Sequence, residues 1–199
     1  MRAAYCLFET PLGLCGIAWR EGENPSAPPA VAFFQLPEAT AETTEARIAR
    51  KTRGYKSSAP PPQILEIIER VRNHLRGQLQ DFGDVAIDLD GAGQFERQVY
   101  EAARRIPAGQ TMTYGELAKA LGLPGAARAV GRALGRNPVP LIIPCHRILA
   151  AGGRPGGFSA PGGRATKARM LATEGVSIVA ATKPVPAASA AGFRILMPN

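Results

Sequence analysis

The chain has 199 residues, 45% of them hydrophobic, and a formal net charge of +8 at pH 7. This length allows one large or two small domains with hydrophobic cores, and the composition is ordinary for a soluble globular protein. No stretch approaches the ~18 apolar residues of a membrane span. The odd number of cysteines, three, argues against a disulfide framework, and the N-terminus MRAAYC lacks the apolar h-region expected of a signal peptide. We therefore expect a soluble, monomeric, cytoplasmic protein without membrane contact.

The charge is distributed unevenly along the chain. Residues 1–92 carry 10 Lys and Arg against 12 Asp and Glu, whereas residues 93–199 carry 14 against 4. A basic half beside a slightly acidic half is typical of a protein that binds a polyanion, most often nucleic acid. The alternative is an arginine-rich surface that only faces solvent.

The first half of the chain has the pattern of an antiparallel sheet with flanking helices. The expected elements are a hairpin of strands 4–9 and 14–19, a strand 31–36, a short helix within 45–53, an amphipathic helix within 62–79 and a strand 85–89. Within them, Cys6 and Cys15 are expected to be packing residues, and His74 a surface histidine. The glycine-containing segment 90–93 predicts a domain boundary, which gives an N-terminal α/β scaffold domain over residues 1–92.

The second half reads as mostly helical. Apolar residues at i, i+4, i+7 and i+11 predict a helix from Gln94 to Ile106. Thr113 and Glu116 form a capping-box pattern that opens a helix to residue 121, and the turn 122–125 leads into a second helix over 126–135. Two short helices joined by a glycine-containing turn favour a helix-turn-helix, although a plain packed helix pair has the same pattern. The expected domain spans residues 93–175 and leaves 176–199 as a tail.

The second of these helices has few of the Asn, Gln and Ser side chains that read bases in the major groove. Arg128 stands alone among alanines near its start. Small residues allow the backbone to approach DNA closely, and a single arginine can enter a narrow groove or a gap in the base stack. The helix therefore favours sequence-tolerant binding.

The stretch 141–149 (LIIPCHRIL) places a thiol, an imidazole and a guanidinium in succession after a buried apolar run. Pro144 interrupts strand pairing, so Cys145 is expected where the backbone leaves the core. His146 as a proton acceptor and Arg147 as a positive charge are the surroundings that lower a cysteine pKa and make it a nucleophile. Because neighbouring residues of a strand face opposite ways, a turn or a bridging water is required. The alternative is a cysteine that only fills the core.

One ordered set of residues resembles a known family, the O6-alkylguanine-DNA alkyltransferases or methylated-DNA–protein-cysteine methyltransferases. The set comprises residues 143–148 (IPCHRI), 127–131 (ARAVG) and 137–138 (NP). The resemblance is strongest over residues 95–175. It implies an α/β protein with a ribonuclease H-like N-terminal sheet domain and a helical domain containing a helix-turn-helix. It also implies single-turnover DNA repair, in which a flipped O6-alkylguanine, and in some cases O4-alkylthymine, gives its alkyl group irreversibly to Cys145.

The resemblance assigns roles to particular residues. His146 would deprotonate Cys145 through water, Glu174 would hold the imidazole, Tyr114 would donate a proton to the guanine, and Asn137 would connect the helix-turn-helix to the cysteine segment. The residues implied in base binding are Pro140, Ile148, Phe158 and Ser159. Those implied in contacting double-stranded DNA are Thr113, Tyr114, Ala126, Ala127, Arg128, Ala129, Gly131, Arg132 and Arg136, with Arg128 filling the vacated base stack.

Two features depart from the family pattern. The loop 158–163 is about two residues longer than the commonest spacing before the helix that the resemblance places at 167–174. Arg132 stands where a smaller residue is expected, so it either adds a phosphate contact or crowds the groove. No cofactor is expected, and no metal, because three cysteines and two histidines lack the ligand spacing of a structural zinc site.

Other classes of protein remain open at this point. A lesion-binding protein of similar sequence would recognise alkylguanine without accepting the alkyl group, but such proteins lack the cysteine present here at 145. A helix-turn-helix regulator of transcription would need neither the Cys-His-Arg segment nor a base pocket. A cysteine hydrolase would require an oxyanion site, for which no motif is visible.

Overall fold

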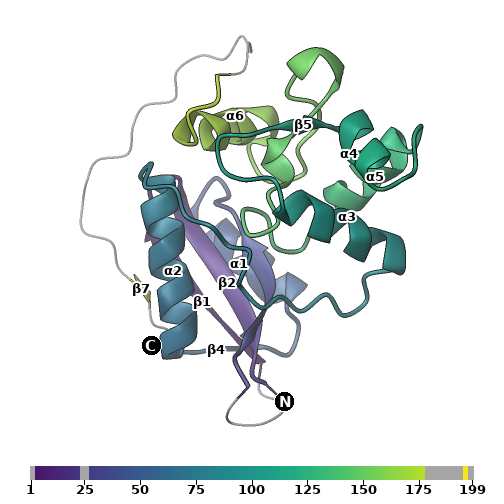
Figure 1. Cartoon of the computed structure of the whole chain (residues 1–199). Coiled ribbons are helices and arrows are strands. Elements are labelled where there is room, and N and C mark those ends of the chain that lie inside the picture. The colour runs from purple at the N-terminus through teal and green to yellow at the C-terminus, as the bar shows by residue number, and fades with distance from the viewer. Residues whose placement is uncertain (1–2, 23–26, 178–194, 197–199) are drawn as a thin grey trace. The chain divides into compact units, whose positions relative to one another are not determined.

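The computed structural model describes residues 3–22, 27–177 and 195–196, which contain a mixed sheet and six α-helices (Figure 1). The described residues form two compact units. The first consists of residues up to 80, residues 84–88 and residues 195–196, and the second of residues 81–83 and 89–177. Among the described helices, none has the length and hydropathy needed to cross a membrane.

The first unit is built on a mixed sheet. Strands β1 (Ala3–Thr10) and β2 (Gly13–Arg20) form the predicted hairpin, paired along their full length, and β3 (Ala30–Gln35) continues the sheet antiparallel to β2. The other edge of β1 is covered by two short strands, β4 (Lys56–Ser57) in parallel and β7 (Ile195–Leu196) in antiparallel orientation. The hairpin prediction is confirmed.

Alternation along β1 supplies side chains to both faces of this sheet. Tyr5 and Leu7 pack with Ile48 of helix α1 (Ala41–Lys51). Phe8 points to the opposite face, where the guanidinium of Arg72 from helix α2 (Pro62–Leu75) lies 5.8 Å from its ring centroid. Because successive residues of a strand face opposite sides, the two helices cover the two faces.

The first residue of α1 and the last residue of α2 differ from the prediction, because local capping features end each helix there. α1 begins four residues earlier than expected, because Thr40 and Thr43 form a reciprocal capping box. α2 ends at Leu75, because Gly77 takes up a φ of 92° that a helix cannot continue. The first of these caps lacks the Glu or Gln of the usual signature, so the sequence pattern missed it.

Two further predictions in this unit are wrong. Residues 85–89 do not form a strand, although one was predicted there. Only Ile87 pairs, through a single β-bridge to Val31, because the alternating segment is too short to form a ladder. His74 is not on the surface but 1% exposed, and its Nδ1 accepts a hydrogen bond from the backbone N–H of Gln80 at 3.1 Å. All three cysteines are buried free thiols, as predicted for Cys6 and Cys15.

The second unit is mostly helical. Its elements are α3 (Gln94–Arg104), β5 (Met112–Thr113), α4 (Tyr114–Ala120), α5 (Ala127–Gly135), a 3-10 turn (Cys145–Arg147), β6 (Ile148–Leu149), a second 3-10 turn (Ala151–Gly153) and α6 (Gly163–Thr173). The capping box of Thr113 and Glu116 is present at the start of α4, as predicted. α6 begins at Gly163, earlier than expected, because Gly162 in the left-handed conformation turns the chain into it.

The apolar run before Cys145 is buried but is not a strand. Leu141, Ile142 and Ile143 are at most 2% exposed, and Leu141 has a φ of 78°, a left-handed conformation that is rare for a residue other than glycine. Such a bend is held only when the surroundings fix it. Here Asn137 does so, by donating from its amide to the Ile143 carbonyl at 2.8 Å and accepting from the Val139 N–H at 3.0 Å.

Candidate active site

Cys145 lies at a cavity of about 310 Å³ within the second unit. The cavity is lined by residues from the start of α4, the second half of α5, the 3-10 turn of Cys145 and the loop before α6. Its lining residues are Tyr114, Gly131, Leu134, Gly135, Cys145, Gly157, Phe158 and Ser159. Five of the predicted site residues therefore meet at one cavity, namely Tyr114, Gly131, Cys145, Phe158 and Ser159.

A short pair of parallel strands brings the two ends of this site together. Met112 of β5 pairs with Ile148 of β6, so Tyr114, just after β5, lies near the 3-10 turn that carries Cys145. The Tyr114 hydroxyl donates to the Gly157 carbonyl at 3.4 Å. At Gly156, where φ is 63°, a Cβ would stand 3.2 Å from the Tyr114 ring. The loop thus passes close to the tyrosine because a glycine permits it.

The surroundings of Cys145 differ from the predicted ones. The residue is 7% exposed, and burial raises the pKa of its thiol because a thiolate loses hydration there. A hydrogen bond from the Asn137 side chain, the charge of Lys167 and backbone hydrogen bonds offset part of this rise. The prediction of a lowered pKa is wrong, because the sequence does not show how deeply the sulfur is buried.

Lys167 is the residue whose charge lowers the Cys145 pKa, and it was not predicted from the sequence. Its side chain is 0% exposed, donates to the Ile148 carbonyl, and places Nζ 5.8 Å from the centre of the Tyr114 ring. Burial lowers the Lys167 pKa to about 8, and the Cys145 charge acts in the opposite sense. Met170 and Leu171, three and four positions later, share its buried helix face, and that spacing was the available signal.

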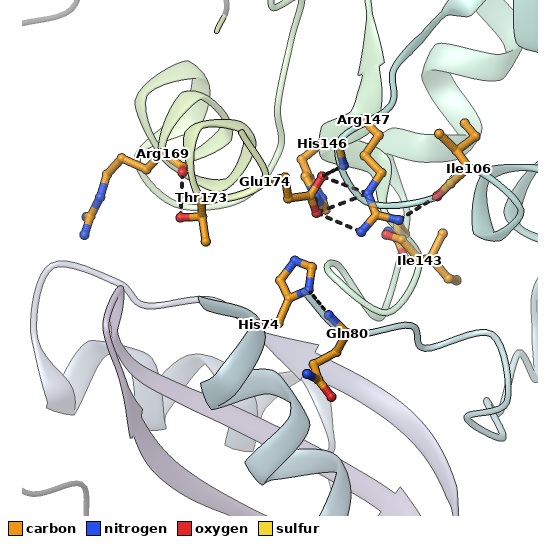
Figure 2. A network of polar contacts seen from close by, with 11 residues as sticks. His74, Gln80, Ile106, Ile143, His146, Arg147, Arg169, Thr173 and Glu174 are labelled. Atoms are coloured by element: carbon orange, nitrogen blue, oxygen red, sulfur yellow. Dashed lines mark hydrogen bonds and ion pairs between the residues drawn. The ribbon is translucent and has the colours of Figure 1, made fainter. Parts of the chain in front are cut away.

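Arg147 has a different partner from the one expected. Its guanidinium donates to both carboxylate oxygens of Glu174 at 2.7–3.1 Å and to the Ile106 carbonyl at 2.6 Å. Figure 2 shows Arg147 and His146 both directed at the Glu174 carboxylate, which follows the end of α6. The arginine therefore balances a buried carboxylate.

The charge that lowers the Cys145 pKa is that of Lys167 instead.

His146 completes this buried cluster. Its imidazole is fully buried, and its Nε2 lies 2.9 Å from Glu174 Oε1. A carboxylate can only accept, so this bond places a proton on Nε2 and leaves Nδ1 as the basic nitrogen. Because Cys145 and His146 lie in a 3-10 turn, the opposite facing expected for an extended strand does not apply.

Several of the predicted residues do not line the cavity, and those predicted to contact DNA differ in exposure. Pro140 and Ile148 do not line it; Ile148 is buried, and its carbonyl holds Lys167. The residues predicted to contact DNA that are exposed are Arg128, Arg132 and Arg136, and those that are half-buried are Thr113, Tyr114, Ala126, Ala127, Ala129 and Gly131. Leu134 and Gly135 line the cavity and were not predicted; their position three and four residues after Gly131 on one helix was the available signal.

Metal ligation was tested by geometry as well. Within the described residues, no three His, Cys, Asp or Glu side chains are grouped so that they could hold a metal ion. The buried polar cluster of His146, Arg147 and Glu174 is internally balanced in charge, with its oxygens occupied by nitrogen donors. The titratable groups that the site brings together are the Cys145 thiol, the His146 imidazole, the Tyr114 phenol and the Lys167 amine.

The fold and the site together define a class of protein in which one buried cysteine, in a Pro-Cys-His-Arg segment, faces a small cavity beside a pair of short helices. A family model described as 6-O-methylguanine DNA methyltransferase, DNA binding domain, matches residues 94–176. A methylated-DNA–protein-cysteine methyltransferase of Mycolicibacterium paratuberculosis is 33% identical over 170 residues, which make up 85% of this chain and 91% of that protein. The chain belongs to the methylated-DNA–protein-cysteine methyltransferase family.

Solved structures agree with this assignment. The chain is similar to Mycobacterium tuberculosis OGT in complex with DNA, with a TM-score of 0.67 and 30% identity over 86% of this chain and 92% of that one. It is also similar to the O6-methylguanine-DNA methyltransferase of the archaeon Pyrococcus kodakaraensis, with a TM-score of 0.65 and 27% identity over 87% of this chain and 99% of that one. Both likenesses extend over most of the two chains compared.

Proposed function

We propose that this protein repairs DNA by transferring the alkyl group of O6-alkylguanine, once and irreversibly, to its own Cys145. The observation that carries the proposal is the position of the Cys145 thiol at a cavity of about 310 Å³, beside Tyr114 and Lys167. The family relationship supports the same reaction. The damaged nucleotide would be flipped out of double-stranded DNA to enter the cavity.

The residues at the site can transfer the thiol proton to guanine while Cys145 accepts the alkyl group. The Cys145 sulfur attacks the alkyl carbon, and the bond from that carbon to the guanine O6 breaks. The thiol proton passes to His146 Nδ1 through a water molecule, while Tyr114 protonates the departing guanine and recovers its proton from the imidazolium. The net result is a thioether and an unmodified guanine, with the thiol proton ending on the base.

The charged side chains support this transfer in distinct ways. Glu174 stabilises the imidazolium that forms at His146, as the acid of a catalytic triad does. Lys167 stabilises the developing thiolate, and Asn137 donates a hydrogen bond to it. Phe158 and Ser159, which line the cavity, contact the base. Burial raises the Cys145 pKa, so Lys167, Asn137 and the proton acceptor His146 are needed to form the thiolate.

We infer that helices α4 and α5 form a helix-turn-helix, with α5 facing the DNA. Its outer side carries Arg128, Arg132 and Arg136 at intervals of one turn, while Val130 and Leu134 are buried on the inner side. Phosphate contacts from such a row bind DNA without reading its sequence. Arg128, at the start of the helix, would take the place of the flipped base.

We also propose a division of the chain into domains and a cytoplasmic location. We assign residues 1–92 to a ribonuclease H-like scaffold domain, which is consistent with the helix-covered mixed sheet, and residues 93–175 to the DNA-binding and acceptor domain. The family match ends at residue 176, which supports a tail over 176–199, of which Ile195–Leu196 pair with β1. Three free thiols suit a reducing compartment, and we place the protein in the cytoplasm.

The test of this function is a titration with a duplex that contains one O6-methylguanine. Product should rise to one methyl group per protein and stop, because a thioether is a poor electrophile toward water and nothing in the site could cleave it. Intact-protein mass would show one added methyl group, and peptide mapping would place it on Cys145. Binding of the modified duplex without any mass change would instead indicate a lesion-binding protein, and binding of one particular unmodified sequence would indicate a regulator.

Arg128→Ala should slow transfer from duplex DNA more than transfer from free O6-methylguanine. Without a side chain in the gap left by the flipped base, unstacking costs up to a few kcal/mol more. The matched control is Arg105→Ala, which removes the same charge from an exposed position at the end of α3. Rates of mass gain measure both reactions, and an equal loss on duplex and free base would exclude the role proposed for Arg128.

A further inference from the structure

The loop before α6 carries two residues of the cavity wall. Phe158 is half-buried and Ser159 is exposed, and both line the cavity at Cys145. One side of this segment is held at Gly157, whose carbonyl accepts a hydrogen bond from the Tyr114 hydroxyl at 3.4 Å. The position of Phe158 and Ser159 therefore depends on what holds the other side, between residue 159 and α6.

The other side is tied to α6 by the hydroxyl of Thr166. This hydroxyl donates to the Pro161 carbonyl at 2.7 Å, which lies five residues back and outside the helix that begins at Gly163. A threonine within a helix usually bonds the carbonyl three or four residues before it. Thr173 of the same helix does so, by donating to the Arg169 carbonyl at 3.0 Å (Figure 2). The Thr166 bond therefore extends beyond the helix and fixes the loop.

Gly162 makes room for this bond. It has a φ of 74°, which glycine adopts without a steric penalty, and a Cβ at this position would collide with the Thr166 hydroxyl. Two backbone hydrogen bonds close the same turn, from Gly163 to the Ala160 carbonyl at 3.0 Å and from Ala165 to the Gly162 carbonyl at 3.2 Å. The turn is thus compact, and Thr166 supplies the side-chain bond that joins it to α6.

We propose that Thr166 is a positioning residue for alkyl transfer, which holds Phe158 and Ser159 at the cavity by anchoring Pro161. This inference rests on the proposed function and adds to it a determinant of the alkyl groups accepted. Because Phe158 and Ser159 line the same cavity as Cys145, the position of the loop sets the room that remains beside the sulfur. A fixed loop favours a small alkyl group, and a loosened loop admits a larger one more readily. Thr166 does not line the cavity, so it acts through the loop.

The inference is tested with Thr166→Val and two duplexes of one sequence, one containing O6-methylguanine and the other O6-benzylguanine. Valine keeps the shape of threonine and removes the hydroxyl. Loss of a hydrogen bond of ordinary strength should slow methyl transfer by about fivefold, the equivalent of about 1 kcal/mol. Benzyl transfer should slow less or become faster, so that the ratio of the benzyl to the methyl rate constant rises at least about threefold. An unchanged or lower ratio would overturn the inference.

Three further variants make the outcome decisive. Thr166→Ser keeps the hydroxyl and should restore the wild-type ratio. Thr173→Val removes a threonine hydroxyl from the same helix without loosening the loop, and it should leave the ratio unchanged. Gly162→Ala should push the Thr166 hydroxyl aside and raise the ratio in the same way, which tests the inference even if Thr166→Val does not fold. The same rise in Thr166→Ser or in Thr173→Val would overturn the inference, whereas a wild-type protein that transfers neither group would overturn the proposed function itself.

Discussion

Replacing Cys145 by serine is expected to abolish alkyl transfer while leaving the affinity for alkylated duplex within about threefold, less than 1 kcal/mol. The sulfur is the only change, and a serine hydroxyl at neutral pH is a far poorer nucleophile than a thiol that can lose its proton to a nearby base. The variant should fold normally, because a hydroxyl at this position keeps the hydrogen bond from Asn137 that the thiol receives. The measurement is intact mass after prolonged incubation with methylated duplex, beside a binding titration.

Cys15→Ala is the matched control for that variant. Cys15 is also a fully buried free thiol, and burial raises its pKa to about 12. It lies in β2 of the first unit, and Thr10 is its hydrogen-bond partner. This control should still gain one methyl group per protein. A methyl group found on Cys145→Ser, at any residue, would move the acceptor away from residue 145 and contradict the proposed mechanism.

The sequence predicted best those parts of the site that depend on neighbours along the chain. The Thr113 and Glu116 cap and the hairpin of β1 and β2 depend on residues a few positions apart. Local backbone preferences and capping bonds decide such features. They can therefore be read from a single sequence, and family resemblance adds the roles of the side chains.

Features that depend on distant partners could not be predicted in this way. Lys167 acts on Cys145 only because α6 packs against the 3-10 turn, and Arg147 is directed to Glu174, 27 residues further along the chain. The burial that raises the Cys145 pKa and hides His74 is also a product of the fold. Residue type and spacing give the direction of a pKa shift only when the depth of the group is already known.

Glu174→Gln should have the largest effect on stability of the substitutions considered, a loss on the order of 3–5 kcal/mol in the free energy of unfolding. Glu174 is buried and accepts hydrogen bonds from His146 and from the Arg147 guanidinium, whose side chain is 6% exposed. An amide removes the negative charge and turns NH₂ hydrogens toward donors, so a buried guanidinium is left without its counter-charge. Denaturant unfolding of the protein and of Glu101→Gln, an exposed carboxylate of α3, gives the comparison.

The same substitution should also slow methyl transfer, by about 10²-fold or more if His146 acts as the base. A glutamine can offer its carbonyl to His146 or its NH₂ group, and only the first preserves the proton on Nε2. The double variant Arg147→Met, Glu174→Gln separates the two effects, because removing both charges should restore part of the stability but not the transfer rate. If the double variant regained the wild-type rate, the buried carboxylate would have no role in transfer. If Glu174→Gln unfolded within about 1 kcal/mol of the wild type, it would have no large role in stability.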